Sequence, residues 1–250
     1  SMEWTNVRLA LLGFLQQPGI GSRRLRALNA RCGSLQAAWN ASPTIWREAE
    51  VPDKTVSELV TRRQRIVLDE LPRALERDSI RLVTPTDTDY PVLFHQMADR
   101  PEGLFVRGTI QHLPWIAFVG SRTMSSYGQH CIDVLIPPLR QTSCGVISGL
   151  ALGVDGAAHR AALKAGIYTA AFLGGGVDEA SLYPRAHIEL AHQILDAGGA
   201  IVSEFGPQTE SRNYHFPMRN RLIAGSTLAT IVVEAALNSG SLITAKSALE

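Results

Sequence analysis

Glycines, hydroxyl residues and arginines recur in this 250-residue chain directly after short apolar runs. Glycine lets backbone N–H groups come close to an anion, and arginine supplies a forked donor that matches a phosphate. The combination predicts a phosphate-binding rim. The residues that we place on this rim are Gly120, Ser121, Arg122, Gly149, Gly174, Gly176, Arg185, Arg219, Asn220, Arg221, Ser239 and Ser241.

The glycines of this rim do not form either of two common nucleotide-binding motifs. A Walker A motif requires Gly-Lys-Ser/Thr, whereas none of Lys54, Lys164 or Lys246 follows a glycine. A dinucleotide fingerprint requires GxGxxG, which the glycines around Gly149 and Gly174 do not match. The sequence therefore argues against a P-loop NTPase and against NAD, and we expect no cofactor.

Asp155 and His159 are four residues apart, which places both on one face of a helix. This spacing could hold a metal ion, but no further ligand is close in sequence. We expect instead that Asp155 caps the helix and that His159 is packed or hydrogen-bonded, without a metal. The three cysteines, Cys32, Cys131 and Cys144, form no CxxC pair and are expected to be reduced thiols.

Glu204 and Glu234 each end an apolar run and could perform acid–base chemistry. We expect them instead to accept hydrogen bonds from the glycine loops or to pair with Arg219 or Arg221. The sequence has no GxSxG nucleophile elbow and no cysteine placed with a histidine. The pattern therefore favours a binding protein over an enzyme.

Three aromatic residues and one turn each allow two interpretations. Phe205, Tyr214 and Phe216 could stack on the bases of a single strand or belong to the core. The Pro-Gly-Ile-Gly turn at 18–21 separates two helical segments. It is typical of a helix-hairpin-helix, whose N–H groups can bind a DNA phosphate, or it is a structural turn in a small bundle.

A β-sheet must position the rim residues. Continuous apolar runs that alternate with helical patterns are typical of parallel strands covered on both faces, and ligands bind at the carboxyl ends of such strands. We therefore predict an α/β fold with a doubly wound, mostly parallel Rossmann-like sheet. The runs lie at 116–119, 146–148, 169–173, 200–205 and 230–233, and the helical patterns near 126–140, 155–165, 185–197, 216–225 and 240–249.

The chain divides into three parts that differ in sequence pattern. Residues 1–80 show helical spacing and many arginines, which predicts a small all-helical domain. Residues 81–115 are expected to form a connector, in which 104–107 could be a short strand. Residues 116–250 form the predicted Rossmann-like domain, which we expect to be incomplete at its C-terminal end because Glu250 lies inside an apparent helical pattern.

Six sequence blocks in this order resemble the DNA-processing protein A family (DprA/Smf). The blocks are 119–122 (Val-Gly-Ser-Arg), 148–159, 173–184, 203–205 (Ser-Glu-Phe), 216–225 and 233–245. The resemblance implies a SAM-like helical domain before an extended Rossmann domain, and single-stranded DNA binding without catalysis. It also implies a homodimer through the Rossmann domain and an interaction with RecA, which members load onto incoming DNA during natural transformation, past single-strand-binding protein.

The resemblance also assigns rim residues to DNA. The Gly-Ser-Arg block places Arg122 in the DNA pocket, and Arg185, Arg219, Asn220 and Arg221 are assigned to it from their positions. An alternative is a nucleotide-processing hydrolase similar to the lysine-decarboxylase-like Rossmann group, whose members carry a PGGxGTxxE stretch. The comparable segment, 238–244, has no glutamate at the right spacing after its threonine, which disfavours this alternative.

The charge of the chain limits how it can bind DNA. Its 24 basic and 23 acidic side chains give a net charge of +1, which excludes binding by bulk charge but allows a focused site. Because residues 101–250 carry 10 basic and 11 acidic side chains, we expect few phosphate contacts per protomer and reliance on dimerisation. No apolar stretch approaches the ~18 residues of a membrane span, so we expect a cytoplasmic protein without a membrane partner.

Overall fold

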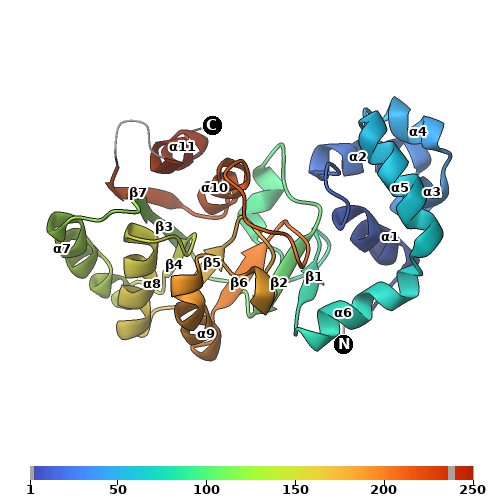
Figure 1. The fold of residues 1–250 in the computed structure, drawn as a ribbon. Helices are drawn as coiled ribbons and strands as arrows, with labels where there is room; N and C mark the ends of the chain where they lie inside the picture. The colour runs from blue at the N-terminus through green and yellow to red at the C-terminus, as the bar shows by residue number, and fades with distance from the viewer. Residues whose placement is uncertain (1–2, 236–239, 250) are drawn as a thin grey trace.

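The centre of the larger part of the chain is one β-sheet (Figure 1). The computed structural model describes residues 3–235 and 240–249, and within them seven strands join in the order β1-β2-β6-β5-β4-β3-β7. Strands β3 to β7 are parallel to one another, whereas β1 and β2 join antiparallel beside β6. The bounds are β1 Arg81–Val83, β2 Leu104–Gly108, β3 Trp115–Gly120, β4 Gly145–Ser148, β5 Thr169–Phe172, β6 Ala200–Ser203 and β7 Ala229–Glu234.

The five predicted parallel strands are β3 to β7, so the mostly parallel α/β fold is confirmed. The short strand suggested at 104–107 is β2, whereas β1 was not predicted. Segment 81–115, expected to be a connector, therefore contributes two strands to the sheet. Phe105 pairs with Ser203 on β6 and with Leu82 on β1, a register between segments far apart in sequence.

Helices cover both faces of the sheet, as a doubly wound fold requires (Figure 1). Along β3, Phe118 is buried beneath α7 and α8, while Ala117 and Val119 belong to the core on the opposite face, beneath α10. This alternation follows from the two-residue period of a strand. The helices are α7 Ser126–Leu135, α8 Val154–Lys164 and α9 Ile188–Asp196 on one face, with α10 His215–Gly225 and α11 Gly240–Ser247 on the other.

The N-terminal part of the chain is a helical bundle. Side-chain caps begin two of its helices: Thr5 accepts a hydrogen bond from Arg8 N, and Ser34 accepts one from Ala37 N. Phe14 is fully buried, with aromatic neighbours in its core. The helices are α1 Asn6–Leu15, α2 Ser22–Cys32, α3 Leu35–Asn40, α4 Pro43–Glu48, α5 Asp53–Arg65 and α6 Leu71–Arg77.

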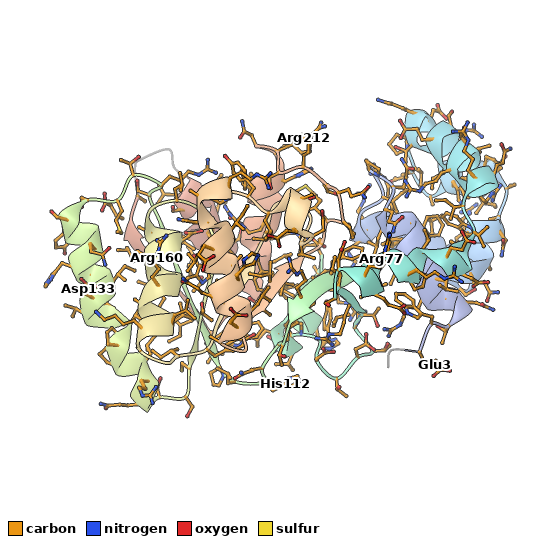
Figure 2. The ribbon with its side chains drawn as sticks, turned by 60° about the horizontal axis from the view of Figure 1, so that its bottom comes forward. Glu3, Arg77, His112, Asp133, Arg160 and Arg212 are labelled. Atoms are coloured by element: carbon orange, nitrogen blue, oxygen red, sulfur yellow. The ribbon has the colours of Figure 1, made fainter. Side chains whose placement is uncertain are left out.

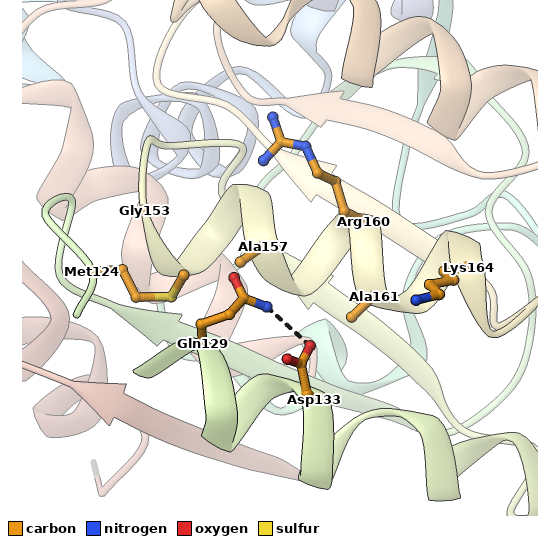
Figure 3. Close-up of a pocket in the computed structure, with 8 residues that line it drawn as sticks. All are labelled: Met124, Gln129, Asp133, Gly153, Ala157, Arg160, Ala161 and Lys164. Atoms are coloured by element: carbon orange, nitrogen blue, oxygen red, sulfur yellow. Dashed lines mark hydrogen bonds between the residues drawn. The ribbon is translucent and has the colours of Figure 1, made fainter. Parts of the chain in front are cut away.

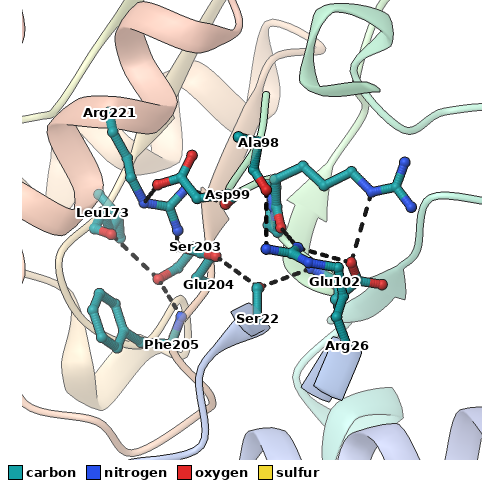
Figure 4. Close-up of polar contacts among 12 residues, drawn as sticks. Ser22, Arg26, Ala98, Asp99, Glu102, Leu173, Ser203, Glu204, Phe205 and Arg221 are labelled. Atoms are coloured by element: carbon teal, nitrogen blue, oxygen red, sulfur yellow. Dashed lines mark hydrogen bonds and ion pairs between the residues drawn. The ribbon is translucent and has the colours of Figure 1, made fainter. Parts of the chain in front are cut away.

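A polar network fixes the helical part to the sheet (Figure 4). Arg26 on α2 donates to the carbonyls of residues 98 and 100 and pairs with Glu102 at 3.0 Å. Ser22, at the start of α2, accepts a hydrogen bond from Glu102 N at 3.0 Å and donates to Glu204 at 3.4 Å. The first turn of α2 thus lies beside the carboxyl end of β6.

In the described ranges, 3–235 and 240–249, no helix is long and apolar enough to cross a membrane.

Candidate nucleic-acid interface

A pocket of about 300 Å³ opens at the carboxyl edge of the sheet, between the loop after β3, the start of α8, and helices α10 and α11. This is where ligands bind in doubly wound sheets. The structure brings together six of the predicted rim residues there: Gly120, Ser121, Arg122, Arg219, Asn220 and Ser241. Ser239 lies outside the described residues.

The loop after β3 is held by backbone contacts from two directions. Ser121 N donates to the carbonyl of Glu234 at 2.6 Å, and the carbonyl of Ser121 accepts from Val154 N at 3.0 Å. A Cβ on Gly153 would overlap the Ser121 carbonyl oxygen, and the φ of +75° at Gly153 favours glycine independently. The glycine-rich start of α8 thus fixes the loop that carries Arg122.

Arg122 is an exposed cation at the mouth of the pocket. Its guanidinium carbon lies 4.8 Å from the ring centroid of Phe216, a cation–π distance. It forms no hydrogen bond or ion pair with another described residue. Of the rim arginines, Arg122 therefore has the exposure and the pocket position that a phosphate contact requires.

Arg219 lies beneath the rim, contrary to the expectation that it faces a phosphate. Its side chain is 5% exposed, and its Nη1 donates to the carbonyls of Gly149 and Phe172, both at 2.7 Å. Its Nε donates to Asn220 Oδ1 at 2.9 Å, while Asn220 Nδ2 donates to the carbonyl of Gly240. Arg219 therefore joins the ends of β4 and β5 to α10, and burial lowers its pKa.

Asp155 is a buried carboxylate whose charge acts on this cation without an ion pair between them. Its carboxylate accepts from Gly149 N at 3.0 Å and from Ala151 N at 3.4 Å, so it binds the loop before α8. Burial raises the pKa of Asp155, and the charge of Arg219 opposes that rise. Both side chains line the inner wall of the pocket, where their hydrogen bonds to backbone groups hold the ends of β4 and β5.

Arg221 is also engaged inside the protein, at the junction in Figure 4. Its Nη2 lies 2.5 Å from Glu204 Oε2, and its Nε lies 3.3 Å from Asp99 Oδ2. The predicted pairing of Glu204 with a rim arginine is thus confirmed. The Glu234 carboxylate instead accepts from Ser125 N at 3.1 Å and from Ser125 Oγ at 2.8 Å, at the start of α7, and pairs with neither Arg219 nor Arg221.

The glycines after β4 and β5 contribute packing rather than free N–H groups. Gly149 N donates to Asp155, and Gly176 N donates to the carbonyl of Thr209 at 2.8 Å. The carbonyl of Gly174 accepts from His215 Nδ1 at 2.8 Å. All three glycines are buried: the segment 206–216 covers Gly174 and Gly176, and the Arg219 side chain covers Gly149.

Arg185 and two tyrosines face solvent near this edge. Arg185 is exposed, with no hydrogen bond or ion pair to another described residue. Tyr183 is 50% exposed, with its ring 6.4 Å from Phe216, and Tyr214 is 61% exposed. Phe205 and Phe216 are both half-buried: Phe205 stacks on the buried His215 at 4.1 Å, and Phe216 packs against Gly174 and Arg219.

Two exposed groups near the pocket were not predicted. Tyr183 follows the glycine loop in the Tyr-Pro-Arg run, so its position beside Arg185 was the available signal. Arg212 projects from the loop before α10 (Figure 2), and its sequence surroundings give no comparable signal.

His159 is packed, as predicted. Its ring is fully buried with Nδ1 2.7 Å from Thr169 Oγ1, and burial lowers its pKa to about 3. Asp155 is directed to loop amides, so the two residues do not form a metal pair. In the described part of the chain, no three histidine, cysteine or acidic side chains are grouped as metal ligands would be.

The turn at 18–21 is part of the junction between helical and α/β parts. Gly19 adopts a φ of +89°, and Gly21 precedes the first turn of α2, whose Ser22 contacts Glu204. These contacts favour the structural interpretation of the turn, since the start of α2 already faces a carboxylate of the protein.

The fold and the pocket define a Rossmann-like protein with a pocket at the carboxyl edge of a doubly wound sheet, the edge at which such sheets bind ligands. Comparison with known families is more specific. The model of the DNA recombination-mediator protein A family matches residues 81–250, and the chain belongs to this family.

Three relatives illustrate the relationship. The chain is 41% identical to Protein Smf of Escherichia coli over 178 residues, which cover 70% of this chain and 47% of that protein. The X-ray structure of DNA processing protein A from Streptococcus pneumoniae superposes with a TM-score of 0.80 at 29% identity, covering 99% of this chain and 84% of that one. A structure of DNA processing protein A from Helicobacter pylori, which concerns its single-stranded DNA binding mode, superposes with a TM-score of 0.59 at 27% identity, covering 67% of this chain and 76% of that one. The chain thus spans about half the length of the Escherichia coli protein.

Proposed function

We propose that this chain binds single-stranded DNA at the carboxyl edge of its sheet and acts as a recombination mediator. In the cytoplasm it would help to load RecA onto incoming DNA during natural transformation, past single-strand-binding protein. Family membership and the Helicobacter pylori relative support the choice of ligand.

The observation that carries the proposal is Arg122, a cation above Phe216 at the mouth of the pocket that has no ion-pair partner within 3–235 and 240–249. Its guanidinium can bind a phosphate, while Tyr183 and Tyr214 expose rings on which bases can stack. Stacking tolerates every base because each has a π-face. The site therefore binds the strand with little reading of its sequence.

The internal use of Arg219 and Arg221 strengthens the expectation of few phosphate contacts per protomer. Weak individual sites gain affinity when two are joined, because the second contact becomes intramolecular. A homodimer through the Rossmann-like part would supply this second site, and RecA would then receive a strand held at two points.

The direct test is a salt titration of binding to a fluorescent oligothymidylate, with a duplex of equal length for comparison. Wild type should prefer the single strand. Arg122→Ala should weaken binding several-fold and reduce the slope of log K against log salt by about 0.7, the value for one lost phosphate contact. Arg77→Ala, which removes an exposed arginine of α6, is the control and should change neither.

An unchanged affinity and slope for Arg122→Ala would refute the pocket assignment. The proposal also involves no chemical step on the DNA or on a nucleotide. Turnover of nucleoside monophosphates by wild type, abolished by Glu234→Gln, would instead favour the hydrolase alternative.

A further inference from the structure

A second, larger cleft of about 450 Å³ lies between α7 and α8 (Figure 3). It begins beside the first pocket, since Met124 and Gly153 line the cleft while Thr123 lines the pocket. Gly153 is also packed against the Ser121 carbonyl. The wall between the two hollows is thus the short loop 121–124 that carries Arg122.

Two cations of α8 line this cleft. Arg160 and Lys164 are four residues apart, which puts them on one helix face with Cβ atoms about 6 Å apart. Both are exposed, and neither forms a hydrogen bond or ion pair with a described residue. Arg26, Arg107 and Arg221, by contrast, each pair with a carboxylate.

The Arg160 guanidinium lies close to the N-terminal half of α8. One of its terminal nitrogens is 3.1 Å from the point that a Cβ on Gly156 would occupy, so it folds back by about one helical turn. This direction leads toward the start of α8 and His187, on the side of α8 away from α7 (Figure 3), so the guanidinium lies at the rim of the cleft. The two cations therefore extend the exposed positive charge along α8, whose first residues adjoin the loop that carries Arg122.

The opposite wall, on α7, carries one acidic group. Asp133 accepts a hydrogen bond from Gln129 Nε2 at 2.9 Å (Figure 3), so part of its acceptor capacity is already used. The cleft keeps a net positive charge from two cations and one carboxylate. Its other lining residues offer no large apolar anchor of the kind a peptide partner would require.

We propose that the backbone of a bound single strand continues from the pocket over the loop 121–124 into the α7–α8 cleft, where Arg160 and Lys164 bind its phosphates. This inference rests on the proposed function and lengthens its site. The cleft follows α8, whose 11 residues span about 16 Å. Only a strand that extends beyond the pocket would therefore reach Arg160 and Lys164.

The test compares two oligothymidylates, one of about five nucleotides that fits the pocket and one of about 15 nucleotides that also reaches the cleft. For the double variant Arg160→Ala/Lys164→Ala, the salt slope for the long oligonucleotide should fall by about 1.4, which corresponds to two single-strand phosphate contacts. Its affinity should fall about tenfold, with the short oligonucleotide unaffected.

The matched control is Arg73→Ala/Arg77→Ala. These two arginines are also exposed, unpaired among the described residues and four apart, but lie on α6 in the helical part; Figure 2 labels Arg77. This control variant should bind both oligonucleotides with the affinity and the salt slope of wild type. Asp133→Asn retains an acceptor for Gln129 and should strengthen binding of the long oligonucleotide about twofold, a gain that a folding defect would not produce.

Equal binding of the long oligonucleotide by wild type and the Arg160/Lys164 variant would overturn the cleft assignment while leaving the pocket intact. So would an equal loss for both oligonucleotides. If wild type bound neither, or if Arg122→Ala bound the short one as wild type does, the proposed function itself would fail and the cleft assignment with it.

Discussion

Replacing Arg219 with methionine should destabilise the protein strongly, because this arginine is a structural cation. The substitution keeps an unbranched side chain but removes the donors to the carbonyls of Gly149 and Phe172. Each of the two carbonyl acceptors left unsatisfied in the interior costs about 1–3 kcal/mol, and the buried Asp155 carboxylate loses the favourable charge of Arg219, so the total should be about 3–5 kcal/mol. Against a typical stability of about 5–15 kcal/mol, the variant should still fold in water.

The loss of stability in Arg219→Met should depend on pH, because the substitution changes the pKa of Asp155. Burial raises the pKa of this carboxyl and Arg219 opposes the rise, so removing Arg219 moves the folded-state pKa further above the ordinary value of 3.8. The folded variant then binds more protons than the unfolded chain at pH values above 3.8, and its stability falls as pH rises through that window. The difference from wild type should therefore be smaller at pH 5 than at pH 7.

The assay is urea unfolding followed by far-ultraviolet circular dichroism at both pH values. With an m-value of about 3 kcal/mol/M, the midpoint at pH 7 should fall by about 1–2 M. Arg122→Met is the matched control, because the same substitution there lies against the same Phe216 ring but on an exposed side chain. That control should stay within about 0.5 kcal/mol of wild type. A midpoint for Arg219→Met close to wild type, or a loss that grows toward acid pH, would refute the reasoning.

Two further predictions concern the start and the middle of α8. Gly153→Ala should cost about 1–3 kcal/mol in urea unfolding and weaken single-strand binding, because the added Cβ overlaps Ser121 and a φ of +75° strains alanine; wild-type values for both would contradict the packing described. The ring of His159 should stay neutral in NMR titrations down to about pH 4, since burial lowers its pKa to about 3. Because the unfolded chain binds that proton more readily, this histidine should make stability fall as pH drops below its ordinary 6.5, and His159→Gln should remove that part of the fall.

The sequence predicted the parallel strands well, since each is a continuous apolar run; burial on both faces explains this pattern for β4, β5 and β6, whereas β7 is a partly exposed edge strand. Arg122 was also found, because its position directly after β3 determines which edge it occupies. The antiparallel strand β1 was missed, since its three residues have no period of their own and form a strand by pairing with β2.

The internal roles of Arg219 and Arg221 could not be predicted from spacing. Whether a long side chain points to solvent or returns to a carbonyl depends on neighbours such as Phe172 and Glu204, which are distant in sequence. The same limit applies to Gly176, whose N–H is covered by a loop that follows the next strand. Residue type predicted which residues lie at the edge of the sheet. The direction of each side chain could be determined only from its packing in the structure.

Helix α10 connects two properties of the molecule that would otherwise be separate. Its first turn holds Phe216 under Arg122, and Arg221, little more than one turn later, anchors Glu204 and through it the start of α2. If a bound strand displaced α10, these direct contacts would transmit the displacement to the helical part. Occupancy of the pocket and orientation of the helical part would then be thermodynamically linked. A partner that fixes the helical part would change the affinity for the strand by the factor by which the strand changes the affinity for that partner.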